Sequence, residues 1–221
     1  PTRSVTAFPK GAAHILTVGC FVAIAAIETS SIAQGAVTGD AMVKTAEVEL
    51  LEARTLSPGK FWVLIGGGVA EVRASHRRGL EAAAETRLDD LFIPQLHEAV
   101  MPALRGRVAG PDHDALGVIE TLTAAAPIVA ADRAAKTADI LLREIRLANG
   151  LGGKGFVTLS GDVASVQAAV EAGRAEAQRS GLLVRAIDET NTRKLPTTRA
   201  MRPLAVRDGV VDAFLTTLTR I

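Results

Sequence analysis

The chain has 221 residues, enough for one or two domains of ordinary size. Its 25 basic and 24 acidic residues give a net charge of +1, which argues against the concentrated basic surface of a nucleic-acid-binding protein. The single cysteine, Cys20, excludes an intrachain disulfide framework and a cysteine-rich metal site.

The N-terminal part of the chain imitates a secretory signal, because Arg3 and Lys10 precede an apolar run at residues 12–27. That run is too short to span a bilayer, which takes about 20 residues. Its end aligns with residues 117–120 further along the chain. We therefore predict an N-terminal extension at residues 1–19, followed by the first strand of a domain rather than by a membrane span.

Strand-like and helix-like segments then follow one another. The strand at residues 20–28 is apolar throughout, so we expect it to be covered on both faces. In the helix predicted over residues 30–45, Ile32, Ala36 and Val37 recur near helical spacing. The other elements predicted in this half are strands at 48–56, 61–65 and 88–93 and helices at 69–86 and 97–104.

The second half repeats this order after a linker at residues 106–114. Its predicted elements are strands at 116–120, 140–148, 156–159 and 182–187 and helices at 124–137 and 163–180. We place the two domains at residues 20–108 and 109–190. A C-terminal extension, residues 191–221, ends in a predicted amphipathic helix that begins at Asp208.

Each half thus reads strand–helix–strand–strand–helix–strand, which is the ferredoxin-like βαββαβ pattern. The fold class predicted from this order is α+β, with an antiparallel sheet and helices on one of its faces. The halves are also copies of one another. Residues 27–54 and 119–146 are identical at 12 of 28 positions with an offset of 92, and the match resumes at an offset of 94. The second copy therefore carries two extra residues just before Gly153, and the long period indicates a duplicated domain rather than a solenoid.

The repeated motifs are Glu-Thr, then Asp-x-x-x-Lys-x-Ala, then a glycine-rich loop and a Gly-x-Val or Gly-Val segment. In combination they resemble the bacterial microcompartment shell domain. Two tandem copies resemble the trimeric, tandem-domain class of shell proteins, in its unpermuted, single-ring subclass. The resemblance implies a homotrimer that forms a pseudo-hexameric disc with a central pore for small metabolites. It also implies a cytoplasmic location in the shell, beside hexameric and pentameric shell proteins, without nucleic-acid or membrane partners.

The glycine-rich loop at residues 150–155 superficially resembles a phosphate-binding loop. It lacks the Ser or Thr after Gly-Lys and leads into a strand instead of a helix, so we reject nucleotide binding. Taken alone, the loop is a turn between strands. The resemblance instead implies that this loop and its counterpart line the pore, through Ser57, Pro58, Gly59, Lys60, Leu151, Gly152, Gly153 and Lys154. Three copies would then place six lysines close to the opening and favour anionic or neutral polar solutes, unless each lysine forms a salt bridge or points into solvent.

Lys44 and Lys136 end the first helix of each half, where a cation complements the helix dipole. The resemblance implies a second role for both at the edge of the disc, together with His97. The segment Asp112-His113-Asp114 contains cation ligands, but we expect it to be solvated in its linker. Glu28 and Glu120 recur at strand ends, where we expect structural hydrogen bonds or salt bridges.

No arrangement of residues typical of a catalytic site is found, so we predict no catalytic residues, no metal site and no enzymatic activity. Some tandem shell proteins hold an iron–sulfur cluster through a cysteine of the second pore loop, and thiolates are the usual ligands of such clusters. Neither loop contains cysteine, so we expect no cofactor. The alternative to a shell protein is a trimeric ligand-binding regulatory protein on the same ferredoxin-like scaffold, because one fold hosts unrelated functions.

Overall fold

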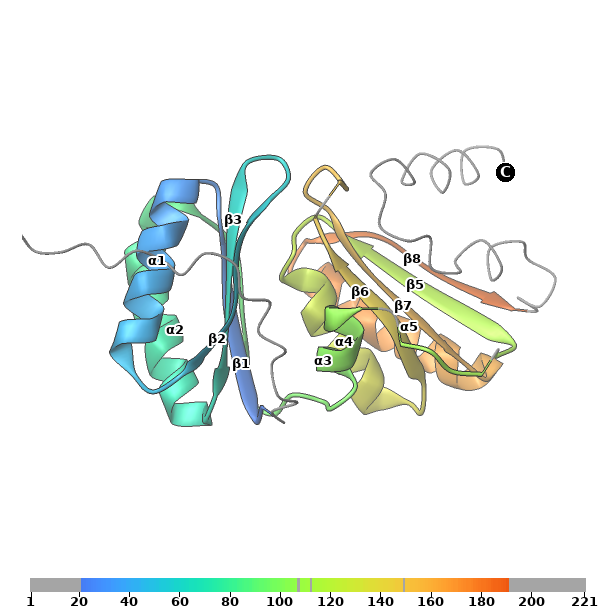
Figure 1. Ribbon diagram of the computed structural model, residues 1–221. Coiled ribbons are helices and arrows are strands. Elements are labelled where there is room, and N and C mark those ends of the chain that lie inside the picture. Colours follow the sequence, from blue (N-terminus) through green and yellow to red (C-terminus); the bar gives the residue numbers. More distant parts are fainter. Residues whose placement is uncertain (1–20, 107, 112, 149, 191–221) are drawn as a thin grey trace, which may run out of the picture.

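The computed structural model describes residues 21–106, 108–111, 113–148 and 150–190. The predicted N-terminal extension, Cys20 and the C-terminal helix lie outside the described residues. Two four-stranded antiparallel sheets are present, each with its own helices on one face (Figure 1). Their strand orders, β2-β3-β1-β4 and β6-β7-β5-β8, confirm the predicted ferredoxin-like α+β fold. None of the helices in this part of the chain is both long and apolar enough to cross a membrane.

The first domain follows the predicted order closely. Its elements are β1 (Ala23–Thr29), α1 (Ile32–Thr45), β2 (Glu49–Leu56), β3 (Lys60–Gly67), α2 (Val69–Ala83) and β4 (Arg87–Ile93). The predicted helix over residues 69–86 ends early, because Ala84 takes a φ of 47° and a single 3-10 turn follows. A short helix, α3 (Val100–Arg105), then leads to the second domain.

The second domain repeats these elements. They are β5 (Ala115–Thr121), α4 (Ala126–Thr137), β6 (Leu141–Leu147), β7 (Gly155–Gly161), α5 (Val163–Arg179) and β8 (Leu183–Thr190). Helix α4 has Pro127 in its first turn, where the missing N–H costs no hydrogen bond. Helix α5 begins at the N-cap Asp162, whose carboxylate accepts a hydrogen bond from the Ser165 N–H.

Helix α1 forms where predicted, but it buries only one large apolar residue, Met42, and leaves Ile32 and Val37 exposed. Its buried face consists of Gly35, Thr38, Gly39 and Met42. A Cβ at Gly35 would lie 2.4 Å from the Cβ of Phe61 on β3, so the helix approaches the sheet too closely for a larger side chain. Ile32 and Val37 are instead 47% and 54% exposed. The spacing of the apolar residues was typical of a helix, but it marks a face that α1 leaves uncovered in the single chain.

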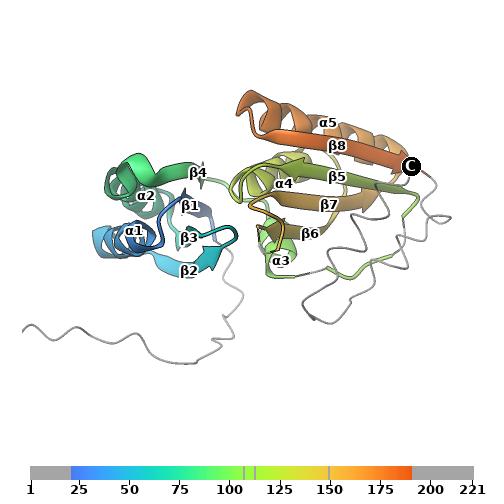
Figure 2. The ribbon, with the colours of Figure 1, turned by 90° about the horizontal axis from the view of Figure 1, so that it is seen from above.

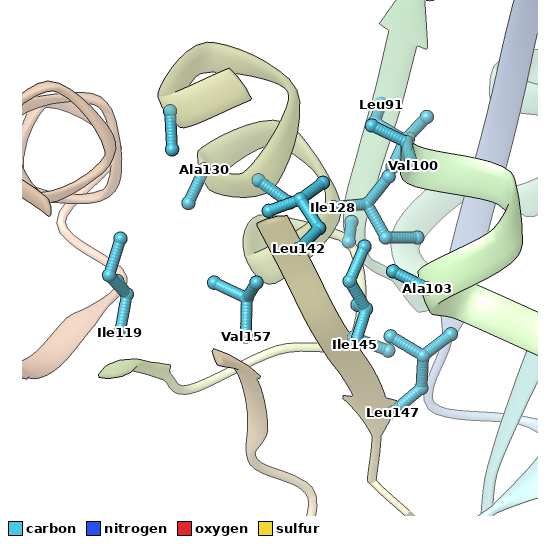
Figure 3. Packing of buried hydrophobic residues seen from close by; sticks show 14 of the residues in the cluster. Leu91, Val100, Ala103, Ile119, Ile128, Ala130, Leu142, Ile145, Leu147 and Val157 are labelled. Carbon is cyan, nitrogen blue, oxygen red and sulfur yellow. The ribbon is translucent and has the colours of Figure 1, made fainter. Parts of the chain in front are cut away.

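The two sheets differ in what covers the face opposite their own helices, which we call the outer face. Every residue of β1 is buried, as predicted, whereas β5 alternates between buried and partly exposed residues. The outer face of the first sheet is covered by the second domain, with α3 and α4 between the two sheets (Figures 1 and 2). Figure 3 shows Leu91 of β4 beside Val100, Ile128 and other buried residues of α3, α4 and β6.

Candidate functional site

The predicted pore-lining residues lie in the turns between β2 and β3 and between β6 and β7, except Lys60, which is the first residue of β3. In the shorter first turn, Gly59 has a φ of 80°. In the second turn, Gly152 and Gly153 have φ values of 61° and 92°, which glycine adopts without the steric cost of a Cβ. These glycines explain how two extra residues fit into a closed turn, in which the Ala148 N–H donates to the Lys154 carbonyl at 2.9 Å.

The two turns belong to different domains but lie side by side at one end of the molecule (Figure 1). A Cβ added to Gly153 would lie 3.2 Å from Pro58 Cδ and 3.1 Å from Lys60 Nζ. Gly59 and Gly152 face open space, since a Cβ at either would meet nothing within 4 Å. The structure therefore brings residues 57–60 and 151–154 together into one pair of turns with open tips.

The lysines that follow these turns each form an ion pair with a glutamate on the neighbouring strand. Lys60 Nζ lies 2.6 Å from Glu28 Oε1, and Lys154 Nζ lies 2.9 Å from Glu120 Oε1. The expectation of structural ion pairs for both glutamates is confirmed. The structure therefore agrees with the alternative in which both lysines form salt bridges. Because each lysine has a negative charge beside it, the ion pairs give no support to a ring of six unpaired cations that attracts anions.

Glu28 also connects the two domains. Its side chain is fully buried, and its second carboxylate oxygen accepts a hydrogen bond of 2.8 Å from the backbone N–H of Ala124, just before α4. A carboxylate at the start of a helix is favoured by the helix dipole. Beside this contact, the Thr123 hydroxyl donates to the carboxylate of Asp89 on β4. We call this contact of the first outer face with the start of α4 the interdomain joint.

Two adjacent carboxyl groups on β4 have shifted pKa values in opposite directions. Burial raises the pKa of Asp89, while its hydrogen bonds with Thr123 and the Asp90 N–H oppose that rise. The contact with His76, whose Nε2 lies 3.0 Å from the carboxylate, lowers the pKa of Asp90 most, and Arg87 lowers it further. Both shifts follow from burial and from the hydrogen bonds and charges that surround these carboxylates on β4.

The predicted edge residues fall into two different environments. Lys136 pairs with Asp132 at 2.6 Å and donates to the carbonyl of Gln95, so it spans the two domains. The backbone N–H of His97 donates to the same aspartate at 2.8 Å, which places His97 and Lys136 close together. Lys44 pairs with Asp40 one turn earlier in α1, and its side chain is 71% exposed.

The linker histidine is not simply solvated, contrary to expectation. His113 is partly buried, and its Nδ1 lies 3.0 Å from Ser160 Oγ, which also accepts a hydrogen bond from Arg143 Nε. These contacts hold the linker against β7. Within residues 21–106, 108–111, 113–148 and 150–190, no three or more His, Cys, Asp or Glu side chains gather as a metal site.

Comparison with known proteins identifies the family. The BMC domain matches the sequence over residues 23–96 and again over residues 115–188. The chain is 40% identical over 162 residues to the bacterial microcompartment shell protein PduT of Citrobacter freundii, covering 73% of this chain and 88% of that protein. This chain belongs to the BMC-domain family of bacterial microcompartment shell proteins.

Two further relatives agree with this assignment. The crystal structure of a microcompartment protein from Desulfitobacterium hafniense DCB superposes with a TM-score of 0.69 at 46% identity, covering 76% of this chain and 94% of that one. The carboxysome assembly protein CcmO of Synechococcus elongatus is 31% identical over 160 residues, or 66% of this chain and 56% of that protein. The shell-protein interpretation, with a structural role, is confirmed, and these relatives lend no support to the regulatory alternative.

Sequence reasoning identified the shell domains but missed the interdomain joint. Glu28, Asp89 and Thr123 meet there, although 34 or more residues separate Thr123 from the other two. One signal was available, since Glu28 with Lys60 recurs as Glu120 with Lys154. A pair of opposite charges that is retained in both copies indicates a contact between the two side chains. Only the structure shows that Glu28 also accepts a hydrogen bond from the backbone just before α4.

Proposed function

We propose that three copies of this shell protein form one disc, in which six BMC domains surround a central pore. The placement of the two turns is the main support for this proposal. The turn of the first domain and the corresponding turn of the second domain lie side by side at one end of a single chain. A contact of one domain with the next can close into a ring when it is repeated with rotation. Three chains then supply the six domains, and the disc takes its place in a cytoplasmic microcompartment shell with hexameric and pentameric partners.

The pore in this proposal is lined by residues 57–60 and 151–154, and small metabolites pass through it. Gly59 and Gly152 present backbone and open space rather than bulky side chains. Because Lys60 and Lys154 are paired with glutamates, selection by size and polarity is proposed in place of attraction of anions. The protein itself performs no reaction and holds no cofactor in this proposal. It contributes a part of the shell wall and a pore through that wall.

The edge of the disc is proposed to include Lys44, Lys136 and His97. Lys44 supports this role because it is exposed and paired only with a neighbour on its own helix among the described residues. Lys136 and His97 are already engaged with Asp132, and only their solvent-facing parts remain for a neighbouring disc. Lys44 is therefore the main candidate for contact between discs.

Electron microscopy of the purified protein, alone and coexpressed with other shell proteins, tests the proposal. We expect discs that associate into sheets or become part of closed shells, whereas isolated particles that never join shells would contradict a shell role. Permeation of a small metabolite through reconstituted shells tests the pore. Leu151→Trp should slow permeation, and Leu50→Trp, on an exposed position at the far end of β2, is the matched control.

A further inference from the structure

We infer that Arg54 and Trp62 bind a small monovalent anion, of the size of chloride, on the covered outer face of the first sheet. The anion accepts one hydrogen bond from the guanidinium Nη1 of Arg54 and one from the indole Nε1 of Trp62. Glu28 of the interdomain joint is the next residue in the same row of side chains. The site lies within a single chain, so it does not depend on the proposed disc.

The first argument is the position of the two side chains. Arg54 of β2 lies directly opposite Trp62 of β3, and Trp62 lies directly opposite Glu28 of β1. Residues that face each other in an antiparallel pair have Cβ atoms about 4.5–5.5 Å apart on the same face of the sheet. Trp62 is fully buried, in the cluster that includes residues of the second domain. The three side chains therefore form a row across the outer face that the second domain covers.

The second argument is that this row has more hydrogen-bond donors than acceptors. Glu28 already accepts a hydrogen bond at each of its carboxylate oxygens. Arg54 Nε donates to Glu52 at 3.1 Å, which occupies one side of the guanidinium. Arg54 Nη1 and Trp62 Nε1 are buried, and neither has an acceptor in the described part of the chain. Since buried polar groups in folded proteins nearly always have hydrogen-bond partners, these two donors require an acceptor that the described residues do not supply.

The chemistry of the two donors determines the class of ligand. An indole N–H and a guanidinium N–H only donate hydrogen bonds, so the ligand must be an acceptor. Arg54 also carries a permanent positive charge, and hydrogen bonds between oppositely charged groups are stronger than neutral ones, which favours an anion over water. Because Trp62 is fully buried, a monatomic ion fits with the least displacement of packed side chains.

The second copy of the domain lacks this pair of donors. Arg146 and Phe156 correspond to Arg54 and Trp62, at offsets of 92 and 94. Phe156 has no N–H, and the guanidinium of Arg146 lies 6.0 Å from the centre of its ring. The side chain of Arg146 is also more exposed than that of Arg54, at 48% against 33%. The donor pair is therefore a feature of the first copy, and Arg146 provides an internal control.

Trp62 is the only tryptophan of the chain, so its fluorescence reports directly on the site. Bromide, a heavy halide that quenches indole fluorescence on contact, is the probe. Quenching should saturate as the bromide concentration rises, and chloride should reverse it, whereas gluconate at the same ionic strength is too large to do so. In Arg54→Gln the bromide concentration at half-saturation should rise about ten-fold or more, since a charge-assisted hydrogen bond is lost. Arg146→Gln is the matched control and should leave the quenching curve unchanged.

Quenching that rises without saturation, and equally in the wild type and Arg54→Gln, would overturn the inference, because the two donors would then meet only water. Thermal denaturation provides a second test that does not require Arg54→Gln to fold. An anion that binds the folded chain stabilises it, so replacing gluconate with chloride should raise the Tm of the wild type. Trp62→Phe, which reproduces the second copy, should show a smaller rise. No rise in the wild type, or an equal rise in both proteins, would also overturn the inference.

Discussion

Glu28 at the interdomain joint should contribute more to stability than an ordinary surface ion pair. Replacing it with alanine removes the only acceptor that the described residues show for Lys60 Nζ, whose side chain is just 17% exposed. The same change leaves the buried N–H of Ala124 without its acceptor. Breaking a buried ion pair by removing one partner costs about 3–5 kcal/mol. We expect Glu28→Ala to lower the free energy of unfolding by about that amount.

Thermal denaturation followed by circular dichroism, at one fixed protein concentration, measures this effect. For a chain of this size each kcal/mol lowers Tm by about 2–4 °C, so we expect a decrease of about 6–20 °C. Glu28→Gln keeps one acceptor oxygen and should fall between alanine and wild type. Glu81→Ala, which breaks an exposed pair with Arg78, is the control and should change stability by about 0–1 kcal/mol. A loss for Glu28→Ala no larger than that of the control would refute the reasoning.

Three further predictions address the joint, the turn and the edge. Burial raises the pKa of Asp89, so the stability that its protonated form contributes is lost as pH rises from below 3.8 through the raised value. The free energy of unfolding of Asp89→Asn, measured by urea denaturation, should therefore compare more favourably with that of the wild type at pH 7 than at pH 4. The opposite order would contradict burial as the cause of the shift. Gly153→Ala should cost about 1–2 kcal/mol in the same assay because of the positive φ, whereas Ser57→Ala in the neighbouring turn should be nearly neutral. Lys44→Ala should leave melting unchanged but reduce the sheets seen by electron microscopy, and sheets that form as in the wild type would remove Lys44 from the disc edge.

The element order could be predicted from the sequence because each signal was local or repeated. The buried strand β1 is apolar at nearly every position, and its burial on both faces was correctly expected. The duplication then allowed each half to be checked against the other. Two copies of one pattern of strands and helices are far less ambiguous than a single copy.

The face of α1 that packs on the sheet could not be predicted from the sequence. Apolar spacing reports that a helix face prefers to be buried, but it does not say what buries it. Ile32 and Val37 fit a core-facing stripe, yet the close approach at Gly35 and Gly39 selects a different face for the sheet. The Lys60 and Lys154 ion pairs were uncertain for a similar reason, since their glutamate partners lie 32 and 34 residues away and are reached only through strand pairing.

The mass of the 221-residue chain in dilute solution tests the central claim most directly. Size-exclusion chromatography coupled to light scattering should give about 69 kDa, which is the mass of three chains of 23.0 kDa joined in a closed ring. This mass should stay constant over a range of micromolar concentrations, because a closed ring adds no further subunits. A stable species of 23.0 kDa at micromolar concentration would contradict the pseudo-hexameric disc.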